Sequence, residues 1–341
     1  MAQARRAKAL VKYRGQDISR YVTTFSYTDN YDQTDDLRIT LSDRDMSWTD
    51  DFFPETGDTL EASIEVFDWN RRGDNRTFDF GSFEIDDVGW DGAVSISATA
   101  VPITGSGRSE KKHETWKQVN LSAIAGDIAG NVGVALVYDT DVDPFYDVAD
   151  QIDKSDLEYL EELCKSDGLC LKVTDGQLIV FEESKYESEP EVTTIIKGSS
   201  DILGPSPKNE PRFNRKAKDV YKACEISHFD PKTDELYTGY FEAPNVGDVG
   251  HTLTLREHFN SEGDDISLNR KAKARCREKN RNEWTCEVVM KGDIIYFSGT
   301  NIKFEGWYRF DGKYHITNCN HTIGNSGYTT SMRTRRCLEG Y

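Results

Sequence analysis

Three consecutive stretches decide the fold of this chain: LSAIAGDIAG (121–130), QIDKSDLEYLEELCKSDG (151–168) and LCLKVTDGQLIVFEE (169–183). Apolar residues recur three and four positions apart in the first two stretches, which predicts amphipathic helices. The third stretch has two short apolar runs around a turn, which predicts a hairpin. Together they predict a small α/β module in the middle of the chain. Its order of elements contains no recognisable arrangement of catalytic groups.

The two helices have matching signals at their ends. Asn120 is the expected N-cap of the first helix, and Gly130-Asn131 predicts its end. The second helix begins with Ser155 and Glu158, which have the S-x-x-E spacing of a capping box. All these local signals favour the same module.

The hairpin and the start of the module have signals of their own. Asp175-Gly176 tolerates positive φ at both central positions of a type I′ turn, so we expect the hairpin to turn there. A basic and aromatic lead-in, Arg108 to Trp116, precedes the first helix. The module is therefore expected to span residues 105–190.

The chain before the module is predicted to consist of strands. Segments 21–30 and 36–43 alternate apolar and polar residues, the period of a half-buried strand. A longer strand pair is predicted over 80–101, with a turn at Asp91-Gly92. No segment here has a helical period, so we expect an antiparallel sheet or barrel.

The chain after the module is again mostly β, with one helix. Strands are predicted over the ranges 218–229, 235–243, 283–290, 293–299, 314–323 and 327–337. The helix, SLNRKAKARCREKN (267–280), has basic residues all around it. We expect this basic helix to be exposed and to pair with acidic neighbours or with an acidic partner surface.

These patterns predict a mainly β chain of the α+β class. A first antiparallel β-barrel domain is expected over residues 1–104 and a helix–helix–hairpin α/β module over 105–190. A linker with one short strand is expected over 191–212. A second β-barrel domain, containing the basic helix, is expected over 213–341.

A weak internal repeat links the two β regions. Gly57-Asp58 and Gly292-Asp293 each open a predicted strand. Each region then ends in a long alternating strand after a glycine-containing turn, namely 94–101 in the first and 328–335 in the last. The repeat predicts that the two barrels are related.

Composition limits the function classes. The net charge of −18 opposes binding to duplex DNA, so we expect no sequence-specific nucleic-acid binding. The sequence has no apolar run of about 18 residues and no signal peptide, which predicts no membrane insertion and folding in a cytoplasm. The seven cysteines have no disulfide-framework spacing, so we expect buried thiols in a reducing compartment.

One strand contains a candidate metal site. His315, Cys319 and His321 share parity, which predicts that they lie on one face of the strand, and imidazole and thiolate suit zinc. At about 3.3 Å per residue, however, the two histidines lie roughly 20 Å apart, too far for one metal ion. We therefore expect ordinary strand side chains and no metal site.

Acidic pairs are the other candidate for catalysis. A glycosidase needs two carboxyls held about 5–9 Å apart, and nothing distinguishes the pairs of this chain from solvated acids. The pairs are Asp35-Asp36, Asp50-Asp51, Asp86-Asp87, Glu161-Glu162 and Asp264-Asp265.

Two further groups of residues were weighed as binding sites. The glycine cluster Gly105-Ser106-Gly107 precedes basic residues but does not fit a strand–loop–helix phosphate cradle. Trp48, Trp69 and Trp307 are candidates for partner contacts, with core packing as the default. We expect no catalytic, cofactor-binding or metal residues in this chain.

The order of β domain, α/β module and β domain resembles the late control protein D family, the baseplate hub proteins of contractile phage tails. The residues that carry the resemblance are the lead-in Arg108 to Trp116, the two helices and the hairpin described above. The segment KDVYKACEISHFDPKTDEL (218–236), the basic helix and Gly292-Asp293 also fit. The resemblance covers essentially the whole chain.

The resemblance implies a non-catalytic homotrimer in which two barrels per chain form a pseudo-sixfold ring between a sixfold tail tube and a threefold spike. The implied partners are the tail spike, the tail tube, other baseplate proteins and the tape measure protein. The implied location is the baseplate of a virion or tail-like particle, assembled in the bacterial cytoplasm. Two alternatives stay open: a baseplate-associated cell-wall hydrolase component, and an acidic cytosolic binding module.

Overall fold

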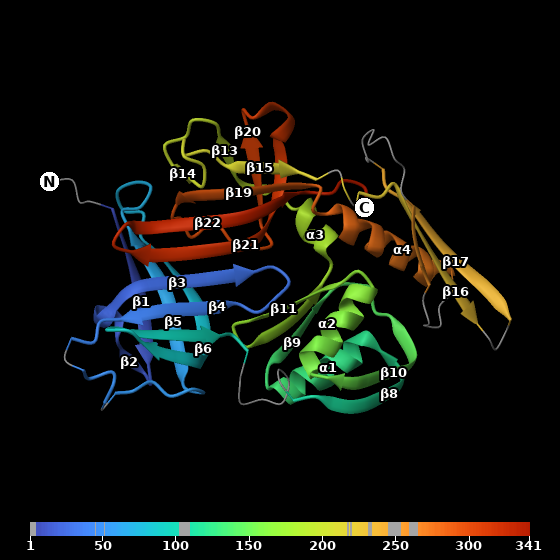
Figure 1. The fold of residues 1–341 in the computed structure, drawn as a ribbon, viewed down its shortest axis with the longest axis horizontal. Helices are drawn as coiled ribbons and strands as arrows, with labels where there is room; N and C mark the ends of the chain where they lie inside the picture. The colour runs from blue at the N-terminus through green and yellow to red at the C-terminus, as the bar shows by residue number, and fades with distance from the viewer. Residues whose placement is uncertain are drawn as a thin grey trace.

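The computed structural model describes residues 5–44, 46–50, 52–101, 110–216, 218, 220–230, 234–244, 254–258 and 265–341. Its largest feature is a curled 14-stranded sheet, accompanied by two three-stranded sheets and one two-stranded sheet (Figure 1). The chain is mainly β and of the α+β class, as expected. The lead-in residue Arg108 and the glycine cluster lie outside the described residues.

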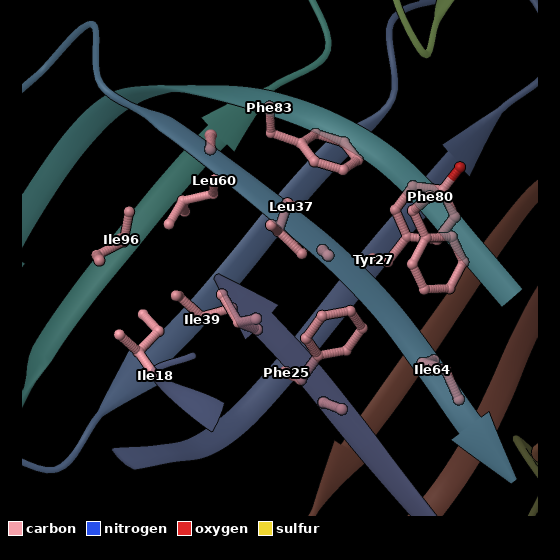
Figure 2. Close-up of a cluster of buried hydrophobic side chains, with 14 of the residues drawn as sticks. Ile18, Phe25, Tyr27, Leu37, Ile39, Leu60, Ile64, Phe80, Phe83 and Ile96 are labelled. Carbon is pink, nitrogen blue, oxygen red and sulfur yellow. The ribbon is translucent and has the colours of Figure 1, made fainter. Parts of the chain in front are cut away.

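The first β region forms one half of the large sheet. Its elements are β1 (Arg6–Tyr13), β2 (Gln16–Asp17), η1 (Ser19–Tyr21), β3 (Val22–Asn30), β4 (Asp36–Leu41), β5 (Thr59–Phe67), β6 (Arg76–Trp90) and β7 (Val94–Thr99). Alternation along these strands buries Phe25, Leu37 and Ile96, which point toward one another inside the curled sheet (Figure 2). Gly92 has a φ of 71° between β6 and β7, which confirms the predicted turn.

The second β region continues the same sheet. Its elements are β13 (Glu191–Ile196), β14 (Ile202–Gly204), β15 (Arg212–Arg215), β19 (Trp284–Lys291), β20 (Asn301–Glu305), η2 (Tyr308–Phe310), β21 (Gly312–Gly324) and β22 (Gly327–Arg336). Strand β21 pairs with β3 from Asn318 opposite Asn30 to Ile323 opposite Phe25. The two β regions are therefore joined edge to edge by backbone hydrogen bonds.

The middle module packs two helices against short sheets. Its elements are β8 (Lys112–Asn120), α1 (Leu121–Val132), β9 (Ala135–Asp139), β10 (Phe145–Lys154), α2 (Asp156–Ser166), β11 (Cys170–Thr174), β12 (Gln177–Phe181) and α3 (Glu183–Ser188). The apolar faces of α1 and α2 meet the hairpin in one core that includes Ile124, Leu160 and Val180. Asp175 and Gly176 both have positive φ, which confirms the predicted hairpin turn.

The helix ends agree with the sequence in part. The capping box of α2 is confirmed, since the Glu158 amide donates to Ser155 Oγ at 3.4 Å and the Ser155 amide donates to the Glu158 carboxylate at 2.9 Å. Asn120 is the N-cap of α1, but Asp143 from a distant loop accepts the Ser122 amide proton. The predicted end at Gly130-Asn131 is too early, because α1 continues to Val132 and Gly133 supplies the left-handed C-cap.

A separate three-stranded sheet holds β16 (Ala223–Asp230), β17 (Glu235–Glu242) and β18 (Thr254–His258). Helix α4 (Asp265–Asn280) packs on one face of it, where Leu268, Ala272 and Cys276 are buried. A Cβ at Gly239 in β17 would lie 2.2 Å from the Leu268 carbonyl carbon, so glycine permits this close packing. The prediction that the basic helix is exposed is therefore wrong.

Two predictions for the second β region need correction. The apolar run 293–299 forms turns and not a strand, so Gly292-Asp293 does not open one. Its residues Ile294 and Tyr296 are buried in two different cores, and periodicity alone cannot separate such a buried irregular segment from a strand. The interval 191–212, expected to be a linker with one short strand, contains β13, β14 and the start of β15.

Candidate functional site

The middle module contacts the β regions through charged side chains that are buried. At the first junction, β11 directs Lys172 toward β3 and the loop that follows it. The Lys172 ammonium group pairs with Asp29, lies 3.3 Å from Asp35 and donates to Ser298 Oγ at 3.1 Å. Asp29 also accepts the Ser298 amide proton at 2.7 Å. This network joins the module to both β regions at once.

The electrostatics of the first junction follow from its composition of two carboxylates and one ammonium. Burial, only partly offset by Lys172, raises the pKa of Asp35 to about 6. Burial alone would lower the pKa of Lys172, but the charges of Asp29 and Asp35 outweigh it and raise that pKa. The ammonium therefore stays charged where both acids face it.

The second junction surrounds the short helix α3. Arg277 of α4 lies 3.0 Å from Glu183 and 2.7 Å from Glu187, while Arg335 of β22 lies 2.5 Å from Glu183 and also pairs with Glu187. Arg335 is only 2% exposed. Burial would raise the pKa of Glu183, but Arg335 and Arg277 hold it at about 2. Glu183 is thus ionised between two buried guanidinium groups.

Backbone groups near α3 are bonded as well. The Asn301 side-chain amide of β20 donates to the carbonyls of Tyr186 and Glu189 at 2.8 Å each. The Leu338 amide donates to the Glu187 carboxylate at 2.9 Å. His315 Nδ1 lies 2.8 Å from the side-chain amide oxygen of Asn301, and burial together with the charge of Arg335 lowers the pKa of His315 to about 3. Helix α3 is therefore tied to β20, β21 and the end of the chain.

Two glycines allow close approach where the module meets its neighbours. A Cβ at Gly81 of β6, where φ is +82°, would lie 2.1 Å from the Asp175 carboxylate at the tip of the hairpin. A Cβ at Gly168, where φ is +79°, would lie 2.7 Å from the Cβ of Ala274 in α4. Larger side chains would force both contacts apart.

The candidate metal residues do not form a site. A β-bulge between Ile316 and Asn318 reverses the facing of β21, so that His315 pairs with Arg335 and His321 pairs with Thr330. Since positions 335 and 330 of β22 point to opposite faces, the prediction that both histidines share a face is wrong. No group of three histidine, cysteine or acidic side chains suited to a metal ion occurs among the described residues.

Among the residues that the structure describes, Cys319 and His321 form a pair that resembles a nucleophile with its base. Their Sγ and Nε2 atoms lie 3.4 Å apart, but the same Nε2 lies 2.9 Å from the Tyr296 carbonyl. A nitrogen that donates to a carbonyl cannot accept the thiol proton. Burial raises the pKa of Cys319 well above its ordinary value, and both side chains are fully buried. This geometry suits core packing and not nucleophilic catalysis.

The remaining candidates are core or surface residues. Trp48 and Trp69 are buried in the first β region, and Trp307 is half-buried with its indole donating to Glu210. Of the described side chains in the acidic pairs, Asp35 alone is buried. Arg270 of the basic helix pairs with Asp167 at 2.7 Å, which confirms the predicted pairing with acidic neighbours.

The sequence did not point to Lys172, Glu183 or Arg335. Lys172 occupies the polar side of an alternating strand, the side that alternation assigns to water. That side faces β3 instead, because the module docks there. No periodic signal distinguishes a charge that meets solvent from one that meets another part of the same chain.

No family model and no curated protein matches the sequence. Solved structures do match it. The 43 kDa tail protein of prophage MuSo2 from Shewanella oneidensis has a TM-score of 0.70 at 14% identity, over 97% of this chain and 98% of that one. The tail protein from Neisseria meningitidis MC58 has a TM-score of 0.69 at 13% identity, over 97% of each chain.

A third matching structure comes from a secretion system and not from a phage. An Escherichia coli component of the type VI secretion system, described as structurally similar to bacteriophage T4 tail proteins, has a TM-score of 0.55 at 11% identity over 97% of this chain and 78% of that one. No helix among the described residues is long and apolar enough to cross a membrane. The resemblance to phage tail proteins is confirmed at the level of the fold, which this chain shares over nearly its whole length.

Proposed function

We propose that this chain is a structural hub in the baseplate of a contractile tail or tail-like particle. In this proposal three copies form a ring that joins the sixfold tail tube to the threefold spike. The observation that supports it most directly is the whole-chain likeness to phage tail proteins, at TM-scores of 0.70 and 0.69.

The junctions around the module support a mechanical role. A hub between two machines of different symmetry must hold its parts in fixed orientation. The buried pairs of Lys172, Glu183 and Arg335 do this, because moving the module would leave ionised groups without partners in a low-dielectric interior. The edge-to-edge pairing of β3 with β21 fixes the two β regions in the same way.

The proposal includes no catalysis. The Cys319–His321 pair is buried, and its hydrogen bonds do not suit catalysis, as described above. The partners in the proposal are the tail tube, the tail spike, other baseplate proteins and the tape measure protein. The proposed location is the baseplate of the particle, after assembly in the bacterial cytoplasm.

Solution mass tests the proposal. We expect light scattering of the purified chain to give three times the chain mass of 38.7 kDa, or that mass plus the mass of the spike when the two are mixed. Electron microscopy of the parent particle with the chain labelled should place it between tube and spike. A monomer under both conditions would contradict the hub and favour an acidic binding module. Clearing of peptidoglycan by the purified chain would favour the hydrolase alternative.

A further inference from the structure

The sheet of β16, β17 and β18 and the helix α4 form a unit with a core of its own, which we call the α4 unit. Among the described residues, its three strands pair only with one another. Figure 1 shows the unit at one end of the molecule, with α4 on the side of its sheet that faces the rest of the chain. The unit can therefore move without breaking a shared sheet. Its separate apolar cluster consists of Cys224, Ile226, Ala243, Leu268, Ala272 and Cys276.

Arg277 of α4 forms the buried ion pairs that hold the α4 unit against α3. Its partners are Glu183 and Glu187. Arg335 pairs with the same two glutamates but belongs to β22, outside the unit. If α4 moved away, both glutamates would keep one buried cation beside them, while water would reach Arg277. Undocking of the unit therefore costs less than it would if the glutamates lost every partner.

Asn280, the last residue of α4, links three segments where the unit is connected to the rest of the chain. Its side chain is buried, at 2% exposure. The side-chain oxygen accepts the Tyr221 amide proton at 2.7 Å, and the side-chain nitrogen donates to the Tyr221 carbonyl at 2.7 Å. The same nitrogen donates to the Tyr341 hydroxyl at 2.7 Å. Since Tyr221 precedes β16, this one amide joins the entry of the unit, its exit and residue 341.

Residues 337–341 run from the end of β22 to the α4 unit and contact both sides. Toward the body of the molecule, the Leu338 amide donates to the Glu187 carboxylate at 2.9 Å. Toward the unit, the half-buried Tyr341 packs against its core, and the Tyr341 and Phe241 ring centres lie 5.7 Å apart. The segment therefore bridges α3 and the α4 unit.

We propose that residues 337–341 are a latch, which holds the α4 unit against the middle module through Tyr341 and Asn280. When this segment is displaced, the unit undocks as a folded body and exposes the seam beneath α4. Cys170 of β11 marks that seam, because it lines a cavity of about 50 Å³ together with Ala274 and Arg277 of α4. Such motion takes place within one chain, so it does not depend on the proposed trimer.

Reaction of the native cysteines with a thiol reagent tests the latch, with each site followed by peptide mass spectrometry. The reaction rate of Cys170 follows the population of the undocked state. Tyr341→Ala removes the hydrogen bond from Asn280 and the contact with Phe241, so we expect Cys170 to react at least about 20-fold faster. Tyr341→Phe keeps the ring contact and loses only the hydrogen bond, so we expect an increase of about 5-fold.

Tyr308→Ala is the matched control. Tyr308 is 88% exposed in η2, so its loss should leave every rate unchanged. Two further cysteines of the same chain report on unfolding, since Cys224 is fully buried in the core of the α4 unit and Cys319 in the second β region. Both should react as slowly in the variants as in the wild-type chain.

The three cysteines separate the outcomes. Faster reaction of Cys170 alone supports the latch. Unchanged reaction of Cys170 in both variants of Tyr341 overturns it. If Cys224 also reacts faster, the unit unfolds and does not undock as a folded body, which overturns the proposal as well. Faster reaction at all three sites would show a general loss of stability, with the same consequence.

Discussion

The interior of the middle module and its junctions with the β regions are buried by different means. Inside the module, Ile124 and Leu160 are fully buried among apolar neighbours. At the junctions the buried groups are charged, as with Lys172 beside Asp29 and Arg335 beside Glu183. Apolar burial is stabilising but non-directional, whereas a buried ion pair contributes little net stability and a large penalty if misaligned. We infer that the apolar core folds the module and the ion pairs orient it.

The largest effect is expected where a junction loses one charge. Arg335→Met leaves the Glu183 and Glu187 side chains with one buried guanidinium partner fewer. We expect the free energy of unfolding to fall by about 4 kcal/mol, measured by urea titration. Arg333→Met on the same strand, where the arginine side chain is 74% exposed, should change it by less than about 0.5 kcal/mol. Equal effects of the two variants would contradict the comparison.

The next effect is expected inside the module core. Leu160→Ala should lower the free energy of unfolding by about 3 kcal/mol, since it removes a fully buried side chain and leaves a cavity. The loss should be the same at low and high salt, because no charge is involved. Leu163→Ala, at a half-buried position of the same helix, is the control and should cost less. A salt-dependent loss at position 160 would show that the two regions are not distinct.

The dependence of the free energy of unfolding on pH tests the buried titratable groups of the junctions and the β core. Burial lowers the pKa of His315 to about 3 and that of His321 to about 4. As the pH falls, the unfolded chain therefore protonates these histidines before the folded chain does, which lowers the free energy of unfolding. Asp35, with its pKa raised to about 6, acts in the opposite direction because the folded chain takes up its proton first. We expect a net loss of about 1–2 kcal/mol in the free energy of unfolding as pH falls from about 6.5 to about 5.5.

Variants assign this pH dependence. His321→Asn should remove about half of the histidine contribution, while His113→Asn, at an exposed position of β8, should leave the slope unchanged. Asp35→Asn should make the loss on acidification steeper. If none of these variants changes the slope of the free energy of unfolding against pH, the titrating groups lie elsewhere.

The smallest effect is expected at a local contact that belongs to neither region's long-range packing. Ser155→Ala removes the side chain that caps α2 and should lower the free energy of unfolding by about 1 kcal/mol. Ser166→Ala at the other end of α2 should change it by less than about 0.5 kcal/mol. Thermal unfolding followed by circular dichroism measures both, and a larger loss at Ser166 would contradict the capping argument.

Local signals predicted most of the module. The capping box at Ser155 and the turn at Asp175-Gly176 depend on a few neighbouring residues, so the sequence contains all the information they need. The end of α1 was less well predicted, because Gly133 lies beyond an earlier glycine that the helix tolerates. The C-cap is chosen by which glycine can adopt the left-handed conformation when the helix is packed.

Long-range features were predicted less well. The bulge in β21 placed His315 and His321 on opposite faces, and a bulge has no signature in the parity of the sequence. The run 293–299 was predicted as a strand because its residues are apolar, although they enter two separate cores. The repeat between the two β regions and the four-part division of the chain stay predictions.

The sequence by itself determined the mainly β class, the helix–helix–hairpin module in its middle and the resemblance to phage tail proteins. Periodicity, capping and turn chemistry act over a few residues, which is why they can be recognised along the chain. Only the tertiary structure decided that the two β regions share one sheet and that Lys172, Glu183 and Arg335 are buried. Whether a charged side chain meets water or an opposite charge depends on residues more than a hundred positions away, and docking of the module brings them together.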